Sequence, residues 1–224
     1  GGIEGQVFQD QIAASSITRA SPSAATFTNS DGSSVTFAVT FPEEVRNVSI
    51  DDFTLNGGAA SAGASLSTVN TSTSTTVDLT VTGLDGIDGG QTLELDIRDS
   101  DQQDIQDNDD GTVLSGAEPS TNESFTVDTV APQPEAITVS STDTLTAGYS
   151  VTLTVADGDE ELVDAGGASI ELNVGGTTVT DGTFVGITNG DAEFTYTAEA
   201  GENDTAGIEV TGLSGLEDSA GNAI

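Results

Sequence analysis

Hydrophobic and polar residues alternate along most of the chain. In residues 34–41, Val35, Phe37 and Val39 are separated by small or polar residues, and residues 149–156 repeat the pattern. A period of two is typical of a half-buried β-strand, and no stretch shows the period of an amphipathic helix. The pattern therefore predicts an all-β protein.

The alternating runs predict two groups of short strands separated by turns rich in Gly and Asp. In the first half the predicted strands lie near residues 12–20, 34–41, 47–55, 65–69, 75–82, 91–98 and 124–129. In the second half they lie near residues 135–140, 149–156, 168–174, 177–187, 192–198 and 206–212. Pro132 and Pro134 interrupt any strand between the groups and stiffen the link. This arrangement predicts two tandem β-sandwiches, residues 12–132 and 133–224, with residues 1–11 in front of them.

The two ends of the chain are complementary in sequence. Residues 124–132 predict a closing strand and a linker, and the second half reaches residues 218–224 at the point where the first half still has that strand to come. Residues 6–14 align with residues 124–132 when Asp10 is placed on Asp128, which puts Val7 on Phe125. We therefore expect the second domain to lack its final strand.

Residues 1–11 of another copy are the expected donor of that strand. A sheet edge with unpaired N–H and C=O groups accepts an added strand. The side chains expected to fill the open core are Ile3, Val7 and Phe8, and Asp10 would take the place of Asp128. Ile3 and Val7 share one face of a strand, and Phe8 points to the other face. The alternative is a fragment of a longer repeat array, which explains both ends equally well.

A second alignment of the two halves stays open. Residues 81–84 and 210–213 share the letters Val-Thr-Gly-Leu, whereas strand order pairs residues 91–98 with 206–212. In either alignment the second domain is incomplete.

The charge balance is extreme, with 38 acidic residues against 3 basic ones and a formal net charge of −35. Such a surface repels phosphate backbones and anionic lipid, so we expect no nucleic-acid partner. No apolar run has the length of a transmembrane helix, so we expect no membrane insertion. Self-repulsion of this size calls for salt or bound cations, as in a halophilic protein or one that binds calcium.

Acidic residues gather at three places where they predict calcium binding. The densest is a loop in which residues 107–111 supply closely spaced oxygens and a Gly, without the spacing of an EF-hand. Its alternative is a solvated, salt-adapted loop. A second place is the domain junction, if the sandwiches stack end to end, and a third is the acidic turn near Asn222. The candidate ligands are Asp99, Asp101, Asp104, Asp107, Asp109, Asp110, Asp128, Asp157, Asp159, Glu160, Glu217 and Asp218.

The composition argues against an enzyme. The chain has no His, Cys or Lys, so most general bases, common nucleophiles and zinc ligands are missing. Aromatic residues are only 4%, too few to favour a sugar-stacking groove. Carboxylate pairs occur everywhere and therefore indicate no catalytic site.

Four Asn-X-Ser/Thr motifs are candidate glycosylation sites, at Asn47, Asn70, Asn122 and Asn203. A chain this rich in Ser and Thr produces such motifs by chance, and chance is the favoured interpretation.

Residues 33–55 contain a Val-Thr-Phe strand, an acidic turn and an Asp-Phe-Thr-Leu strand. They resemble the Ig-like repeats of large bacterial surface proteins and adhesins, as do the closing strand 125–132 and the acidic turn 218–222. The resemblance covers nearly all of the first domain and is looser in the second, where residues 157–161 replace the Pro-Glu-Glu turn. It implies two tandem Ig-like β-sandwiches, an extracellular location and a non-catalytic role. The missing final strand is where this chain departs from the family.

We therefore expect a structural subunit of a pilus-like surface filament. Copies of the chain would polymerise head to tail by strand donation and be stabilised by cations, Ca²⁺ among them. This resembles the logic of chaperone–usher pili, without their usual disulfide. The alternatives are a stalk segment of a calcium-stiffened repeat adhesin and, in another class, a carbohydrate-binding module.

Overall fold

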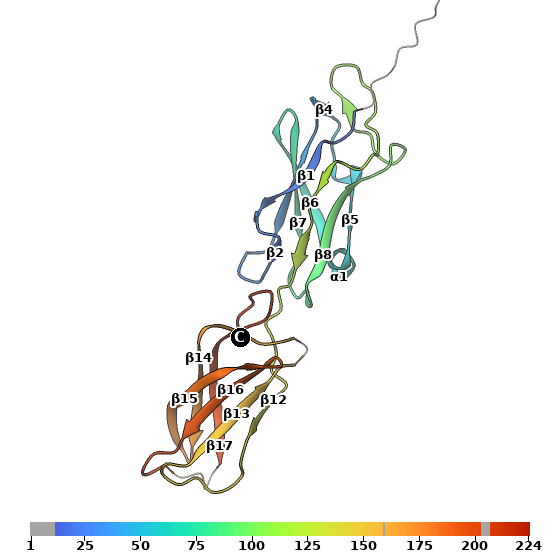
Figure 1. Cartoon of the computed structure of the whole chain (residues 1–224). Coiled ribbons are helices and arrows are strands. Elements are labelled where there is room, and N and C mark those ends of the chain that lie inside the picture. Colours follow the sequence, from blue (N-terminus) through green and yellow to red (C-terminus); the bar gives the residue numbers. More distant parts are fainter. Residues whose placement is uncertain (1–11, 159, 203–206) are drawn as a thin grey trace, which may run out of the picture. The chain divides into compact units, whose positions relative to one another are not determined.

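The computed structural model describes residues 12–158, 160–202 and 207–224, and their regular secondary structure is almost entirely β-strand (Figure 1). The predicted all-β class is confirmed. The chain divides into two compact units, unit 1 up to Thr129 and unit 2 from Val130, and each is described by itself. No helix in the described part of the chain is long and apolar enough to cross a membrane.

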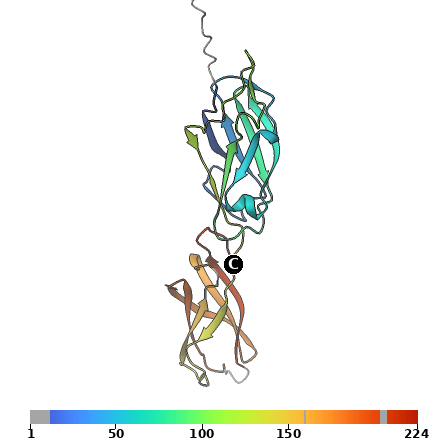
Figure 2. The same ribbon diagram turned by 90° about the vertical axis from the view of Figure 1, so that its right-hand side faces the viewer.

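Unit 1 is a sandwich of two sheets (Figure 2). The first sheet has the order β10 (Thr121–Asn122), β1 (Ser16–Ser21), β3 (Val35–Thr40), β7 (Thr76–Thr82) and β6 (Ser65–Thr73). The second has the order β2 (Thr26–Phe27), β11 (Phe125–Val127), β8 (Gln91–Ile97) and β5 (Phe53–Asn56). The short strands β4 (Val45–Arg46) and β9 (Gln106–Asp107) pair with each other beside them.

Aromatic rings fill the space between the two sheets of unit 1. Along β3 every second residue is buried, and Phe37 is fully enclosed. Its ring meets that of Phe125 edge to face, with centroids 5.1 Å apart and an interplanar angle of 76°. Such an aromatic pair adds about 0.5–1.5 kcal/mol beyond the apolar area that it buries. The closing strand β11 is therefore part of the core.

Unit 2 is built on a single sheet of six strands. Their order is β12 (Ala136–Val139), β13 (Ser150–Ala156), β16 (Asp191–Thr197), β15 (Thr177–Thr188), β14 (Val163–Val174) and β17 (Ile208–Glu217). Every neighbouring pair is antiparallel. Register shifts between Ile170 and Leu172, and between Phe184 and Gly186, bend the two longest strands. One face of the curled sheet encloses a core that includes Phe194.

Strand pairing settles which strands of the two units correspond. β16 lies between β13 and β15 as β7 lies between β3 and β6, and β17 pairs with β14 as β8 pairs with β5. β17 therefore corresponds to β8, as strand order suggests. The shared letters in residues 81–84 and 210–213 are not structural equivalents, because residues 81–84 span the end of β7 whereas residues 210–213 lie within β17.

The expected strand at residues 47–55 begins only at Phe53. Asn47 has a positive φ of 63°, and a 3₁₀ turn, η1 (Ile50–Asp52), follows. Ser49 caps this turn, because its N–H and hydroxyl both donate to Asp52 Oδ2 at 2.6 and 3.0 Å. The helix α1 (Gly58–Ala62) and the two-residue strands were not predicted, since they are too short to show a period.

Candidate functional site

Both edge strands of unit 2 line one groove, which we call the edge groove. It is lined by Ile137 and Val139 of β12, Leu153 of β13, and Ile208 and Val210 of β17, and its volume is about 540 Å³. β12 and β17 are the two ends of the six-stranded sheet, so each presents a row of N–H and C=O groups that no strand of the described part of the chain pairs with. The edge groove therefore lies between two free strand edges.

Apolar side chains remain exposed in the edge groove. All four residues of β12 are exposed, with Ile137 at 41% and Val139 at 36%. On β17, Ile208 and Val210 are only half-buried, although both pack against the core. Each large aliphatic side chain gains about 1.5–3 kcal/mol when it moves from full exposure to full burial. A strand laid in the groove would recover part of this.

The far end of β17 is already covered by the chain itself. After the turn at Asp218, Ile224 N–H donates to the Leu216 carbonyl at 3.1 Å, and Ala223 bridges to Glu217. These contacts leave the stretch from Ile208 to Ser214 as the part of the β17 edge without a strand partner among the described residues.

The corresponding place in unit 1 is occupied by β11. This strand pairs antiparallel with β8 and parallel with β2, so it joins two strands that would otherwise be edges. Phe125 and Val127 point inward and are fully buried, whereas Thr126 between them is exposed. Unit 1 thus shows what a strand in this position does.

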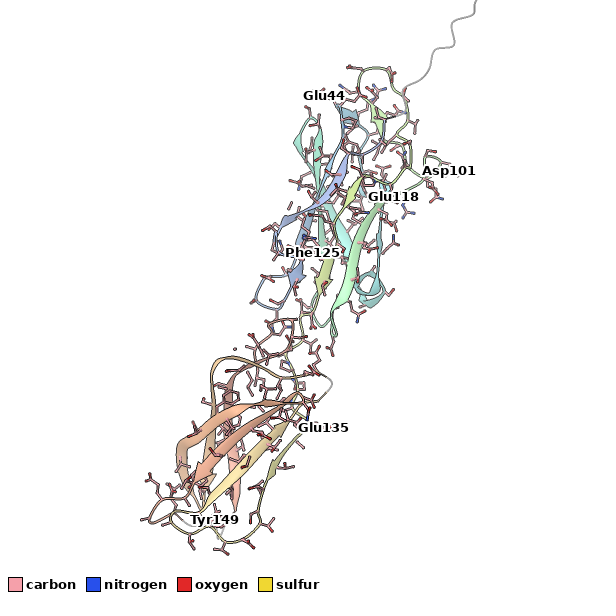
Figure 3. The ribbon with its side chains drawn as sticks, in the orientation of Figure 1. Glu44, Asp101, Glu118, Phe125, Glu135 and Tyr149 are labelled. Carbon is pink, nitrogen blue, oxygen red and sulfur yellow. The ribbon has the colours of Figure 1, made fainter. Side chains whose placement is uncertain are left out.

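The acidic loop predicted to bind calcium holds its carboxylates with backbone hydrogen bonds. Asp107 Oδ1 accepts the Asp109 N–H at 2.6 Å, and Asp110 Oδ1 accepts the Thr112 N–H at 2.8 Å. Hydrogen bonding from Thr112 lowers the pKa of Asp110. Asp101 is exposed (Figure 3). Among the described residues, no three carboxylates of this loop come within 4.8 Å of one another, so calcium binding here stays a prediction.

Two of the loop's other members lie in different surroundings. Asp104 donates its backbone N–H to Asp52 Oδ1 at 3.0 Å and is exposed, and Asp99 accepts the Gln102 N–H at its carbonyl at 2.8 Å. Both carboxylates face solvent rather than a common centre.

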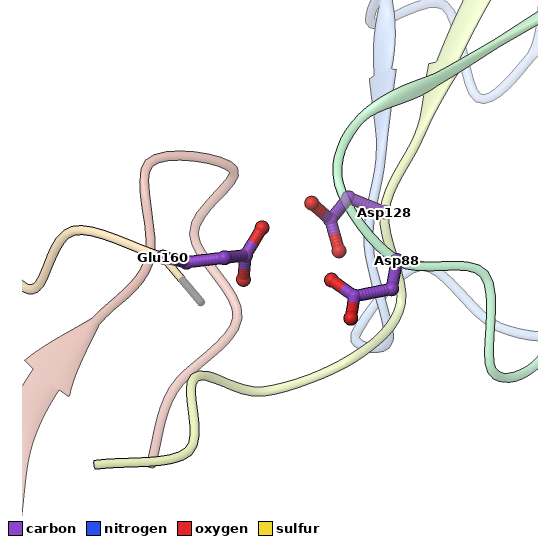
Figure 4. Close-up of side chains that lie close together, drawn as sticks. All are labelled: Asp88, Asp128 and Glu160. Carbon is purple, nitrogen blue, oxygen red and sulfur yellow. The ribbon is translucent and has the colours of Figure 1, made fainter. Parts of the chain in front are cut away.

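Asp128 directly follows β11, and it lies close to a second carboxylate that the sequence analysis did not single out. It is 2% exposed, and its Oδ2 accepts the Gly90 N–H at 3.1 Å. A carboxylate oxygen of Asp88 lies within 4.8 Å of one of Asp128 (Figure 4). Asp88 is far from Asp128 in sequence, in the loop before β8, so only the fold brings them together.

The junction residues of unit 2 meet other carboxylates of the same unit. Desolvation and then the neighbouring carboxylate of Asp191 raise the pKa of Asp157, with smaller contributions from Glu161 and Glu135. Asp157 N–H also donates to Asp191 Oδ1 at 3.1 Å. Glu160 is half-buried, and Asp159 lies outside the described residues.

The acidic turn after β17 is closed by its own backbone. Asp218 is 1% exposed, and its Oδ1 accepts the N–H groups of Ala220, Gly221 and Asn222 at 2.7–2.9 Å. Its Oδ2 accepts from Asn222 Nδ2 at 2.8 Å. These bonds give Asp218 a structural part in the turn, while Glu217 remains half-buried beside it.

The candidate glycosylation sites differ in their surroundings. Asn122 Nδ2 lies within hydrogen-bonding distance of Leu95 O, Asp96 Oδ1 and Glu118 Oε2 at 3.3–3.5 Å. Asn47 and Asn70 are exposed, the latter on the edge strand β6. Asn203 lies outside the described residues, as do the proposed donor residues Ile3, Val7, Phe8 and Asp10.

Comparison with known families found no family model that matches the chain, and comparison with curated proteins found no matching sequence.

Proposed function

We propose that the chain is a structural subunit of an extracellular, pilus-like surface filament, and that its copies polymerise head to tail by donor-strand complementation. Residues 1–11 of one copy add as a strand to the edge groove of the next. The observation that supports this best is that both edge strands of unit 2 face one groove, in which aliphatic side chains stand beside the uncharged polar residues Thr138, Ser141 and Thr142. The role is structural, with no catalytic group assigned to it.

The chemistry of the edge groove favours a strand over a soluble ligand. None of the described residues that line it is charged, in a chain whose formal net charge is −35. β12 carries neither a charge nor a proline, which are the usual protections of an edge strand. A peptide strand satisfies the two rows of backbone groups and covers the apolar side chains at the same time.

Assembly of such acidic copies needs cations. Coulomb repulsion between copies falls as salt shortens the Debye length, which is about 3 Å at 1 M ionic strength. We propose that Ca²⁺ contributes as well, at the acidic loop of residues 99–110. Removal of Ca²⁺ by a chelator at constant ionic strength should lower the melting temperature, and an unchanged value overturns the calcium proposal.

Deletion of residues 1–11 tests the filament directly. The intact chain, the deleted chain and a chain with residues 1–11 in scrambled order are compared at high salt with calcium, by electron microscopy and light scattering. Only the intact chain should form filaments, while circular dichroism shows all three folded. Filaments from the deleted chain, or an intact chain that stays monomeric, overturn strand donation.

The same experiment separates the alternatives. An intact monomer would favour the stalk segment of a repeat adhesin, in which a later strand of the same chain fills the edge groove. Binding on a glycan array would favour the carbohydrate-binding module.

A further inference from the structure

The direction of a strand in the edge groove is dictated by the sheet. All five neighbouring pairs between β12 and β17 are antiparallel, so the two edge strands run in opposite directions. A strand antiparallel to β17 is therefore parallel to β12. β11 has this same pairing in unit 1, antiparallel to β8 and parallel to β2.

The register can be transferred from unit 1 through matched residue pairs. Leu55 and Asn56 of β5 pair with Leu95 and Glu94 of β8. In unit 2 the same letters of β14, Leu172 and Asn173, pair with Val210 and Glu209 of β17. Val210 of β17 is therefore the structural equivalent of Leu95 of β8.

Two residues earlier in each strand, Ile208 is the equivalent of Leu93. Leu93 is the residue that pairs with Phe125 of β11. The donor residue that replaces Phe125 should therefore lie opposite Ile208.

The alignment of Asp10 with Asp128 identifies that donor residue as Val7. Asp128 fixes the end of β11 through its bond from the Gly90 N–H, so it is a structural landmark and not only a matching letter. With Val7 opposite Ile208, Gly5 lies opposite Val210, and Ile3, Gly5 and Val7 share the inward face.

The free part of the β17 edge accommodates this register. Residues 1–7 would run along β17 from Ser214 to Ile208, which is the stretch left open beside the contact of Ile224 with Leu216. Phe8 then points outward, as Thr126 does in unit 1.

We propose, on the basis of the function proposed above, that residues 1–9 of a second copy bind the edge groove in one register. Val7 lies opposite Ile208, the strand runs antiparallel to β17 and parallel to β12, Ile3 and Val7 face the groove, and Phe8 faces out.

Disulfide trapping tests the register, because the chain has no cysteine of its own. A chain carrying Val7→Cys is mixed with one carrying Ile208→Cys, oxidised mildly, and the bridged peptides are identified by mass spectrometry. Directly opposite residues have Cα atoms about 4.5–5.5 Å apart, within the range of a disulfide. We expect at least about tenfold more bridging than from the matched pair Phe8→Cys and Ile208→Cys, since Phe8 points away.

Each other result has a separate meaning. Equal or stronger bridging by Phe8→Cys overturns the register, while loss of filaments on deleting residues 1–11 would still support strand donation. Bridging only within a single chain that carries both Val7→Cys and Ile208→Cys overturns the second copy as donor. Because Ile208→Cys can weaken unit 2, Val7→Asp and Phe8→Asp are compared in parallel. Val7→Asp should abolish filaments and Phe8→Asp should leave them; the reverse overturns the register.

Discussion

Unit 1 and unit 2 differ most at one strand position. In unit 1, β11 fills it and buries Phe125 and Val127 completely. Among the described residues no strand takes this position in unit 2, and Ile137 and Val139 remain exposed in the edge groove. The rest of each unit still forms a continuous core, so the comparison isolates one strand. The comparison shows that this strand buries further apolar side chains and pairs the sheet edges, in addition to a core that the other strands form.

The largest expected effect comes from weakening that strand in unit 1. Phe125→Ala removes a fully buried ring and its edge-to-face contact with Phe37, and should lower the free energy of unfolding of unit 1 by about 3–5 kcal/mol. Urea denaturation measures it. The control is Thr126→Ala on the exposed face of the same strand, which should change stability by less than about 0.5 kcal/mol. Similar losses from both variants would contradict the assigned faces of β11.

A smaller effect should follow from making the donor strand more like β11. The alignment that places Val7 on Phe125 places Gln9 on Val127, which is fully buried. Gln9→Val should therefore stabilise the filament by about 1–2 kcal/mol per joint, or about five- to thirtyfold slower subunit release. Dissociation of preformed filaments in urea measures it. Gln6→Val, on the outward face, is the control and should change little; a greater gain from Gln6→Val would place the other face inward.

Most of the fold could be predicted from alternation because half-buried strands carry their signal locally. β3 and β13 show it clearly, with Phe37 and Leu153 on their buried faces. The segment before Phe53 was predicted as strand because its apolar spacing resembles alternation. There the Ser49–Asp52 cap and the positive φ of Asn47 override the pattern.

The candidate site could be predicted only in part. Comparison of the two halves of the sequence predicts an unfilled strand position, but it does not predict which strands line the edge groove. That β12 and β17 share one groove depends on how far the six strands curl, which the bends at Ile170 and Phe184 help to set. The pairing of Asp88 with Asp128 likewise needs the loop before β8 to meet the end of β11.

The smallest expected effect concerns how the two units hold their acidic residues. In unit 1, hydrogen bonding from Thr112 lowers the pKa of Asp110, so the folded unit favours that charge. In unit 2, desolvation and the carboxylate of Asp191 raise the pKa of Asp157, so the folded unit disfavours it. Asp157→Asn should therefore stabilise unit 2 at pH 7, measured as a higher urea midpoint at low salt.

The sign of the pH dependence distinguishes this cause from a general loss of charge. Because the folded-state pKa of Asp157 lies above the usual 3.8, the native state binds its proton first as the pH falls, and the penalty disappears. The advantage of Asp157→Asn should be full at pH 7 and vanish as the pH falls below about 3.8. Asp143→Asn removes one charge from an exposed site of the same unit and should give a smaller gain. Equal gains from the two variants at pH 7 would show that net charge alone, and not the contact with Asp191, sets the stability of unit 2.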